Sequence, residues 1–391
     1  MSRMPDPSIG DWFNLRDGRS SFEIHPRTDR ALYFERKNLY DKIQREIRKA
    51  FLEKKAPKLV IWGDWGIGKT HTLSHIQYFL ENNADKYPCK IIFLELNDIE
   101  KKTRFDLLHH QILDAISMEY IAEELLSKLQ SKHQKKIKDC LRLYLESSDL
   151  VNAFSSLLGA GQNQQLGWSW LNGQGLTQNE RGMLPVTGDL TNSKDFVDIL
   201  RFIGDVHREL EGKVLLVLID EVEKLERVKD DDAIDHWTQA LKDLASPGNE
   251  SVGIILAASL RSQEDLDKLS PLSDDQVRSR FGYDDGYVEM PNFQSNDTEA
   301  FLKDVLSKIV DHDKLKTQTG SLKSRYSTQF DEDVYPFTKE AFDTFVEYVS
   351  RDPAQAVPRA IMKRLDDLAF EAFEAQNPLI DGELLEKMDY D

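Results

Sequence analysis

The stretch LVIWGDWGIGKTHTL, residues 59–73, constrains the fold more than any other part of the sequence. An apolar run typical of a buried strand passes directly into a glycine-rich turn and then into Lys-Thr. Glycine accepts the left-handed backbone that such a turn requires, and consecutive peptide N–H groups in it can point at one anion. The spacing fits G-x-x-x-x-G-K-[ST], the pattern of a phosphate-binding loop between a strand and a helix. A strand-to-helix turn without a ligand is the alternative.

The loop therefore predicts a site for ATP and Mg²⁺. Its amides and the N-terminus of the following helix would hold the α- and β-phosphates. Lys69 would reach the β- and γ-phosphates, and the Thr70 hydroxyl would ligate Mg²⁺. The expected nucleotide-binding residues are Gly63, Asp64, Trp65, Gly66, Ile67, Gly68, Lys69, Thr70 and His71.

A second signal is an acidic pair, Asp220 and Glu221, at the end of the most apolar run of the chain, KVLLVLIDE at residues 213–221. Carboxylates at the carboxyl end of a buried strand point into the crevice where open α/β sheets bind ligands. We expect Asp220 to hold Mg²⁺ and Glu221 to polarise the attacking water as a general base. An ordinary acidic turn at a strand end is the alternative.

Composition limits the classes of partner. Of 391 residues, 40% are hydrophobic and 31% charged, which is typical of a globular protein with ordinary cores. The net charge of −18 argues against a broad basic face, so any nucleic-acid contact must be local or shared between subunits. Cys89 and Cys140 have no metal or redox spacing, and no segment has the pattern of a signal peptide or membrane span. We therefore expect a cytoplasmic protein without membrane contact.

Strand-like and helical patterns alternate in the first three quarters of the chain. Residues 38–52 carry apolar side chains four apart, which predicts a helix, and a second stripe places Leu108, Ile112, Ile116 and Tyr120 on one helical face. Strands are expected at the start of residues 59–73 and at residues 89–96, 213–221 and 251–259. This alternation predicts a parallel sheet with helices on both faces, a three-layer α/β core.

The pattern changes in three places. Residues 1–32 are expected to form an irregular arm, and residues 159–193, which hold seven of the twenty glycines, a loop-rich insertion. From residue 296 onward the patterns are helical. We therefore expect an arm (1–32), an α/β core (33–292) interrupted at about 159–193, and a small helical lid domain (293–391).

The order of phosphate loop, Asp-Glu strand, next strand and helical lid resembles that of the AAA+ ATPases, and within them the replication-initiator type that includes origin-recognition proteins. The resemblance covers roughly residues 33–375. It implies a P-loop NTPase core with an all-α lid, and ATP hydrolysed between subunits of an oligomer. In that type the strand after the Asp-Glu strand ends in a small polar residue that senses the γ-phosphate, which places Ser259 in this role. A merely exposed or helix-capping serine is the alternative.

Three arginines follow from the same resemblance. SDDQVRSRFGYDDGYVEMPNF (273–293) resembles the segment that carries the arginine finger, which falls on Arg280 with Arg278 as the second candidate. SRDPAQAVPRAIMKRL (350–365) places the lid arginine at Arg359, although this segment is longer than the Gly-Asp-x-Arg spacing of the family. YFERKNLYDKI (33–43) aligns Arg36 with the adenine-side segment. A surface arginine in a salt bridge is the alternative for Arg280.

Two features depart from the initiators. They usually append a winged-helix DNA-binding domain after the lid, which is not expected here. The insertion, WSWLNGQGLTQNERGMLPVTGDL, resembles ATP-binding proteins of BREX-type phage-defence systems, which carry a W-L-x-G segment before the Asp-Glu strand. Trp168 and Trp170 could instead only anchor the insertion to the core.

The segment NDIEKKTRFD (97–106) is the candidate DNA contact, because Lys101, Lys102 and Arg104 are locally basic. Repeated around an oligomer, these cations would make many phosphate contacts with a strong salt dependence. A solvated cluster at a helix start is the alternative. A second basic patch, SKHQKKIKD (131–139), is expected to be a solvated helix face.

Together these features predict an oligomerising AAA+ ATPase that acts on DNA or marks it for an effector or nuclease-type partner, in anti-phage defence or a mobile element. An ATP-dependent assembly scaffold, recruiting an effector with little or no DNA contact, is the alternative and suits the acidic chain better. A small-molecule kinase is disfavoured, because the Asp-Glu pair and the helical lid have no role in simple phosphoryl transfer.

Overall fold

The structure, a computed structural model, describes residues 8–34, 36–326, 329–352 and 356–388. The sheet order is β2-β3-β4-β1-β5, and the pairs β2–β3, β3–β4 and β4–β1 are parallel. The register places Gly63 opposite Ser259 and Glu95 opposite Asp220, so these residues share the carboxyl edge of the sheet. The strands are β1 (Lys58–Gly63), β2 (Cys89–Glu95), β3 (Val214–Asp220), β4 (Val252–Ser259) and β5 (Tyr287–Met290).

The chain divides into two compact units. The sheet unit comprises residues 39–63 and 76–289, and the helical unit comprises the described residues of 1–38, 64–75 and 290–391. This division differs from the expected domain limits in two places. The N-terminal segment shares a unit with the C-terminal helices, and the phosphate loop with the first turns of its helix does so too.

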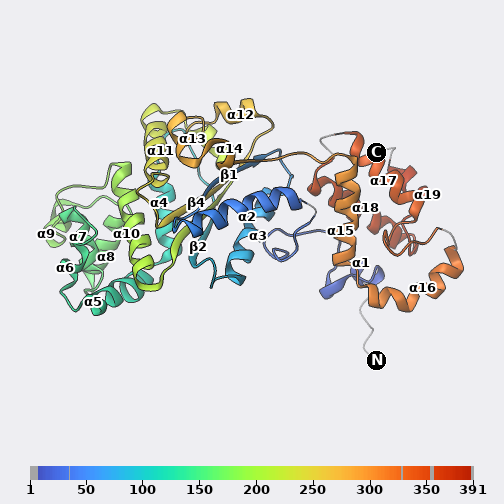
Figure 1. Cartoon of the computed structure of the whole chain (residues 1–391), viewed down its shortest axis with the longest axis horizontal. Coiled ribbons are helices and arrows are strands. Elements are labelled where there is room, and N and C mark those ends of the chain that lie inside the picture. The colour runs from blue at the N-terminus through green and yellow to red at the C-terminus, as the bar shows by residue number, and fades with distance from the viewer. Residues whose placement is uncertain (1–7, 35, 327–328, 353–355, 389–391) are drawn as a thin grey trace. The chain divides into compact units, whose positions relative to one another are not determined.

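Helices cover both faces of the sheet, as the sequence predicts. All seven residues of β3 are buried, and alternate residues of a strand point to opposite faces. Helix α10 packs on β3 and β4, α4 on β2 and α11 on β4, while α2 crosses in front of the strands in Figure 1. The helices that lie wholly or partly in this unit are α2 (Lys37–Leu52), α3 (Lys69–Asn82), α4 (Asp106–Ile116), α5 (Ser127–His133), α6 (Ile137–Leu141), α7 (Ser148–Ser156), α8 (Gln162–Leu171), α9 (Gln178–Met183), α10 (Ser193–Glu211), α11 (Asp231–Leu244), α12 (Gln263–Lys268), α13 (Asp275–Phe281) and α14 (Tyr283–Gly286).

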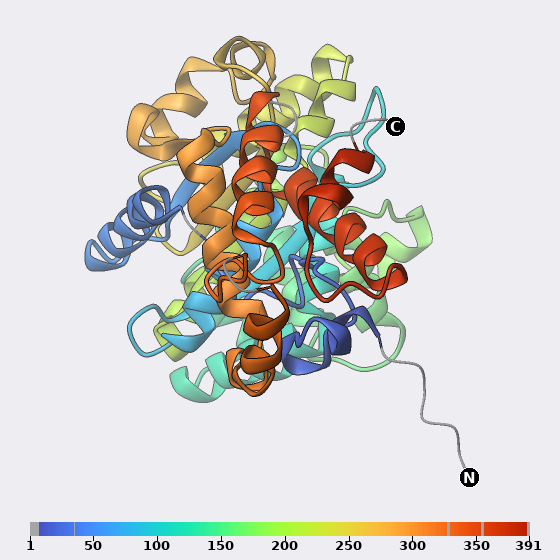
Figure 2. The ribbon, with the colours of Figure 1, turned by 90° about the vertical axis from the view of Figure 1, so that its right-hand side faces the viewer.

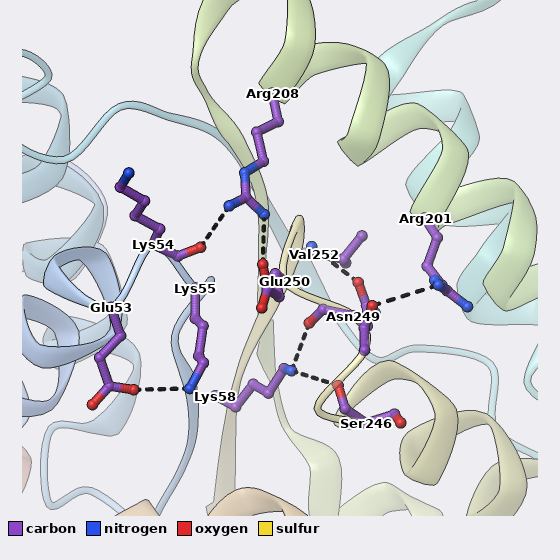
Figure 3. Close-up of polar contacts among 11 residues, drawn as sticks. Glu53, Lys54, Lys55, Lys58, Arg201, Arg208, Ser246, Asn249, Glu250 and Val252 are labelled. Atoms are coloured by element: carbon purple, nitrogen blue, oxygen red, sulfur yellow. Dashed lines mark hydrogen bonds and ion pairs between the residues drawn. The ribbon is translucent and has the colours of Figure 1, made fainter. Parts of the chain in front are cut away.

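A polar cluster anchors the strands at the opposite edge, where β1 and β4 begin (Figure 3). The Lys58 ammonium donates to the carbonyls of Ser246 and Asn249 at 3.2 and 2.8 Å. Burial lowers the pKa of Lys58 to about 8. Arg208 of α10 bridges the Lys54 carbonyl at 2.9 Å and the Glu250 carboxylate at 3.2 Å. These contacts fix how the sheet starts relative to the helices that cover it.

The expected loop-rich insertion at 159–193 contains two helices, α8 and α9, so that prediction is wrong in part. Its glycines are not all loop residues. Gly167 lies within α8, and a Cβ there would come within 1.9 Å of the Ser156 hydroxyl and 2.9 Å of the Ala153 carbonyl of α7. Glycine here permits close packing of two helices. Trp170 is buried among the core residues of the sheet unit, which anchors the insertion there, whereas Trp168 is partly buried. The Trp170 indole donates to the Gly188 carbonyl at 2.8 Å, a contact within the insertion itself.

The helical stripe from Leu108 to Tyr120 is interrupted. Helix α4 ends at Ile116, because Ser117 has a φ of 73°, and a π-helix (Tyr120–Leu126) begins after it. Tyr120 nevertheless stacks on the buried His207 of α10, with ring centroids 5.5 Å apart. The apolar spacing therefore predicts which face is buried but not the break in the backbone.

The helical unit has its own core, formed by residues of the N-terminal segment together with the C-terminal helices. Phe13, Phe22 and Phe34 are buried in it, and both views place α1 beside the C-terminal helices (Figures 1 and 2). The Phe22 amide donates to Asp366 of α18 at 2.7 Å, and Arg16 to the Val310 carbonyl at 2.7 Å. The helices are α1 (Ile9–Trp12), α15 (Ser295–Ile309), α16 (His312–Tyr326), α17 (Lys339–Arg351), α18 (Pro358–Glu374) and α19 (Gly382–Met388).

The N-terminal segment is therefore more than an irregular arm, because its own phenylalanines are buried in the core of the helical unit. The local sequence does not predict this packing, since phenylalanines far apart in the chain give no helical or strand period.

No helix in the described part of the chain combines the length and the apolar composition that a membrane crossing requires.

Truncation of Phe13 tests whether the N-terminal segment belongs to this core. Phe13 is fully buried and packs on Phe22 and Tyr335 at ring distances of 5.8 and 6.4 Å. We expect Phe13→Ala to lower the free energy of unfolding by about 3–5 kcal/mol, measured by urea denaturation. The control, Leu52→Ala at an 85% exposed position, should change it by less than about 0.5 kcal/mol. A Phe13→Ala protein as stable as the wild type would show that the segment is dispensable to the core.

Candidate functional site

The phosphate loop lies between β1 and α3, as predicted. Gly66 and Gly68 have φ values of 78° and 102°, a region that side-chain-bearing residues rarely adopt. A Cβ on Gly68 would meet no atom within 4 Å, so the backbone there faces open space. A Cβ on Gly66 would lie 3.3 Å from the Arg359 side chain and 3.4 Å from that of Val357. The loop is therefore open at Gly68 and closely packed at Gly66.

The loop's own hydrogen bonds hold Lys69 in place. Lys69 is only 6% exposed, and its ammonium donates to the Asp64 carbonyl at 2.8 Å, across the loop. The Asp64 carboxylate accepts from the Trp65 amide at 2.7 Å, and the Thr72 hydroxyl donates to the Gly68 carbonyl at 3.0 Å. A buried ammonium among backbone amides and carbonyls is a suitable cation for a phosphate group.

Residues 30–34 run along the start of α3. The His71 and His75 rings contact the carbonyls of Leu32 and Arg30, and Tyr33 stacks on His75 with centroids 4.7 Å apart. Burial lowers the pKa of both histidines. The His71 side chain is thus committed to this segment, which leaves its backbone amide as the group that could face a nucleotide.

Arg36, the expected adenine-side residue, contacts a neighbouring turn. Its guanidinium donates to the Pro291 carbonyl at 2.9 Å and lies over the Phe293 ring, 4.5 Å from the centroid. Burial lowers its pKa to about 10. These contacts give Arg36 a structural role at the start of the helical region.

Arg359, the expected lid arginine, meets the phosphate loop inside the helical unit. Its amide donates to the Gly66 carbonyl at 3.3 Å. Its guanidinium lies over the exposed indole of Trp65, 4.3 Å from the ring centroid. Pro358 opens α18 and Arg359 follows it directly, so the helix N-terminus lies against the loop. Part of the longer segment before it, residues 353–355, lies outside the described residues.

The carboxyl edge of the sheet carries Asp220 and Ser259. Asp220 is 3% exposed, and its carboxylate accepts from the Glu221 amide at 2.9 Å. The Ser259 amide donates to the Glu223 carboxylate at 2.8 Å, which ties the end of β4 to the 3₁₀-helix (Val222–Arg227) that follows β3. Within the sheet unit, the structure therefore brings the predicted strand-end residues to one edge.

Glu221 is held in a strained conformation. Its φ and ψ are 61° and 36°, a left-handed conformation that costs a non-glycine residue about 1–2 kcal/mol. Its carboxylate forms an ion pair with Lys224, whose ammonium also donates to Asn97 at 2.8 Å. Strain of this kind persists only where the surrounding structure enforces it, and it gathers at functional sites.

The two candidate finger arginines differ in their partners. Arg278 forms an ion pair with Asp267 at 2.6 Å and donates to the Leu272 carbonyl at 3.3 Å. Arg280 donates only to a backbone carbonyl, that of Lys242, among the described residues. An arginine held by one neutral carbonyl is more readily redirected to an anion than one held by a carboxylate.

Lys101, Lys102 and Arg104 are exposed on the segment between β2 and α4, and no ion pair joins them to the described residues. The segment is fixed at its base, where the Lys101 carbonyl accepts from the amides of Lys229 and Asp230 at 3.0 and 3.1 Å. Arg104 also lines a cavity of about 580 Å³ together with acidic residues of α10 and α11. The cations are therefore accessible but have carboxylates nearby.

Three residues at the sheet edge were not predicted from the sequence: Asn97, Glu223 and Lys224. Asn97 lies two residues after the end of β2, and such a position near a strand end could have identified it. Glu223 and Lys224 carry no such signal, because their partners depend on the left-handed turn at Glu221. Within the described ranges, no group of three or more His, Cys, Asp or Glu is arranged to hold a metal ion by itself.

Comparisons with known proteins bear on the fold. No protein-family model and no curated protein sequence matches the chain. The solved ORC2 protein of Aeropyrum pernix, in ADPNP–ADP complexes, is similar over 95% of this chain and 71% of its own, with 13% identity and a TM-score of 0.51. The ORC1 protein of the same organism, in complex with DNA, is 12% identical over 91% of this chain and 65% of its own, with a TM-score of 0.44. RuvB of Thermotoga maritima is 12% identical over 91% of this chain and 69% of its own, with a TM-score of 0.39.

At such low identity the ORC2 likeness shows the fold alone. With the sheet order and the covering helices, it confirms the predicted fold class, a three-layer α/β core of the P-loop type followed by a helical C-terminal region.

Substitution of Glu221 by glycine tests the strain at the sheet edge. Glycine accepts a φ of 61° without steric cost, whereas alanine does not. We expect Glu221→Gly to be more stable than Glu221→Ala by about 1 kcal/mol in urea denaturation. At the exposed Glu226, in the same 3₁₀-helix and without a positive φ, the order should reverse. Equal stability of the two variants at position 221 would contradict the strain.

Proposed function

We propose that this protein is an ATPase that assembles with copies of itself, hydrolyses ATP at the junction between two copies, and acts on DNA or marks it for a protein partner. The phosphate loop carries this proposal. Its two left-handed glycines, its buried Lys69 and the adjoining Arg359 form a cradle of positive charge and backbone amides inside one unit.

The phosphate loop follows directly on a strand of the sheet. Gly63 ends β1 opposite Ser259, and Asp64 begins the loop with the next peptide bond. The loop therefore leaves the sheet at its carboxyl edge, on which Asp220 also lies. Open α/β sheets bind their ligands outside this edge.

Each residue then has a distinct role in hydrolysis. Lys69 and the loop amides hold the phosphates, and Glu221 orients and deprotonates the attacking water. Lys224 pairs with Glu221, so this ion pair must loosen before the carboxylate can accept a proton. Ser259, whose backbone amide donates to Glu223 at the sheet edge, would contact the terminal phosphate.

Mg²⁺ fits the donors that the chain offers. Magnesium prefers oxygen ligands and usually keeps several waters, with one or two carboxylates and substrate phosphates completing its shell. The Thr70 hydroxyl and the buried Asp220 carboxylate are the oxygen donors that would hold it. When bound, the ion neutralises charge that develops on the phosphates.

Oligomerisation follows from Arg280. A guanidinium offered across a subunit boundary stabilises the charge on a transferring phosphoryl group. We assign this role to Arg280 rather than Arg278, because Arg278 is committed to Asp267. Arg359 would contact the same phosphate from the lid and couple the nucleotide state to the position of α18.

The biological setting we propose is anti-phage defence, or target selection by a mobile element, with an effector or nuclease-type partner. Lys101, Lys102 and Arg104 would be the local DNA contact of an otherwise acidic chain. The net charge of −18 favours a second candidate function, an ATP-dependent scaffold that recruits an effector without touching DNA. The two candidates share the same ATP site and differ in the role of these three cations.

ATP turnover and particle mass, measured together with and without duplex DNA, test the proposal. We expect DNA to raise turnover, and Glu221→Gln to trap an ATP-bound oligomer on it, because the amide cannot accept a proton from water. Assembly driven by ATP while DNA changes neither rate nor mass would establish the scaffold instead. A monomer that hydrolyses ATP at the full rate would contradict the shared site.

Charge reversal of the loop cations is the matched test of DNA contact. Lys101→Glu with Lys102→Glu and Arg104→Glu should abolish stimulation by DNA and reduce the salt dependence of DNA binding, because phosphate contacts release counterions. Basal turnover should stay near that of the wild type. The control, Lys135→Glu with Lys136→Glu in the other basic patch, should leave stimulation intact.

A further inference from the structure

Trp65 has a position that the phosphate-loop pattern does not explain. It occupies a variable position of the loop, yet it is a large aromatic residue with 62% of its surface exposed. Burial in a core therefore does not account for the indole. Among the described residues, the indole ring contacts the Arg359 guanidinium, which lies over the ring face, 4.3 Å from the centroid.

Arg359 is otherwise available to an anion. No ion pair joins it to any residue in the described ranges. A guanidinium stacked on an aromatic face keeps its N–H groups free, because they point outward in the plane of the group. A carboxylate partner would have occupied those donors and cancelled the charge, whereas the ring does neither.

Both residues are fixed on the backbone by the same glycine. The Arg359 amide donates to the Gly66 carbonyl, and Gly66 immediately follows Trp65. A side chain on Gly66 would meet Arg359 at 3.3 Å, so the missing Cβ permits this approach. The stacked pair is therefore held at both ends, by the loop and by the start of α18.

We propose that Trp65 is a positioning residue that holds Arg359 ready for the terminal phosphate of a nucleoside triphosphate in the loop. This inference rests on the proposed function. The ring reduces the rotamer freedom that a long arginine would lose on binding, and it does so without occupying a donor. Trp65 thus favours the triphosphate over the diphosphate, since only the triphosphate carries the group that Arg359 would contact.

Nucleotide affinities of the full chain test this assignment. We compare the dissociation constants of a non-hydrolysable ATP analogue and of ADP for the wild type, Trp65→Leu, Trp65→Phe, Arg359→Ala and the double variant. Trp65→Leu should weaken binding of the triphosphate analogue about two- to fivefold and leave ADP within about twofold, as expected for loss of an exposed cation–π contact. Trp65→Phe should retain part of the difference.

The double-mutant cycle separates positioning from a structural role. If Trp65 acts through Arg359, Trp65→Leu should have no further effect once Arg359 is alanine. Phe370→Leu, at a similarly exposed aromatic of α18, is the control and should change neither affinity. An equal loss for both nucleotides, tighter triphosphate binding, or an unchanged effect in the Arg359→Ala background would overturn the inference.

Lys69→Ala distinguishes this inference from the function on which it rests. If that variant loses nucleotide affinity while Trp65→Leu binds both nucleotides like the wild type, only the role of Trp65 fails. If Lys69→Ala binds as tightly as the wild type, the phosphate loop is not the nucleotide site and both proposals fail.

Discussion

The left-handed peptides at Gly66 and Gly68 are the constraint on which the candidate site depends. Both backbone conformations exclude ordinary side chains, and each glycine serves a different neighbour. At Gly68 the missing side chain leaves open space beside Lys69, while at Gly66 it admits Arg359 and Val357 to close contact. The same short turn therefore leaves room for a phosphate and accepts the first turn of α18. This explains why the loop shares a compact unit with the C-terminal helices.

The sheet edge stores strain where we place the chemistry. Asp220 is buried at the end of β3, and the next residue, Glu221, turns into a left-handed conformation that a glutamate would not choose. The turn lets Glu223 reach the Ser259 amide and Lys224 reach both Glu221 and Asn97. A general base that is paired with a lysine is held in position but neutralised. Hydrolysis in our account therefore requires a change at this pair.

The sequence predicts the fold class and the framework of the site, because both depend on local patterns. The glycine spacing, the apolar strands and the acidic strand end each occupy a few consecutive residues, and the parallel sheet follows from their alternation. The packing of the N-terminal phenylalanines against α18 and the helical character of the insertion depend on contacts between distant residues. Gly167 illustrates the difference. The glycine-rich sequence around it suggests a loop, whereas in the structure it lies in a helix that packs closely against α7. The stacking of Trp65 on Arg359 likewise has no local signal.

The central claim is that ATP is hydrolysed between two copies, with the phosphate loop of one and Arg280 of the other. Mixing two inactive variants, Lys69→Ala and Arg280→Ala, tests it directly. Each variant alone should be inactive, one for lack of phosphate binding and the other for lack of the finger. In an equal mixture, about a quarter of the junctions would combine an intact loop with an intact Arg280, and ATP turnover should recover in proportion. A mixture that forms oligomers but stays inactive, or an Arg280→Ala protein that is fully active alone, would contradict the account.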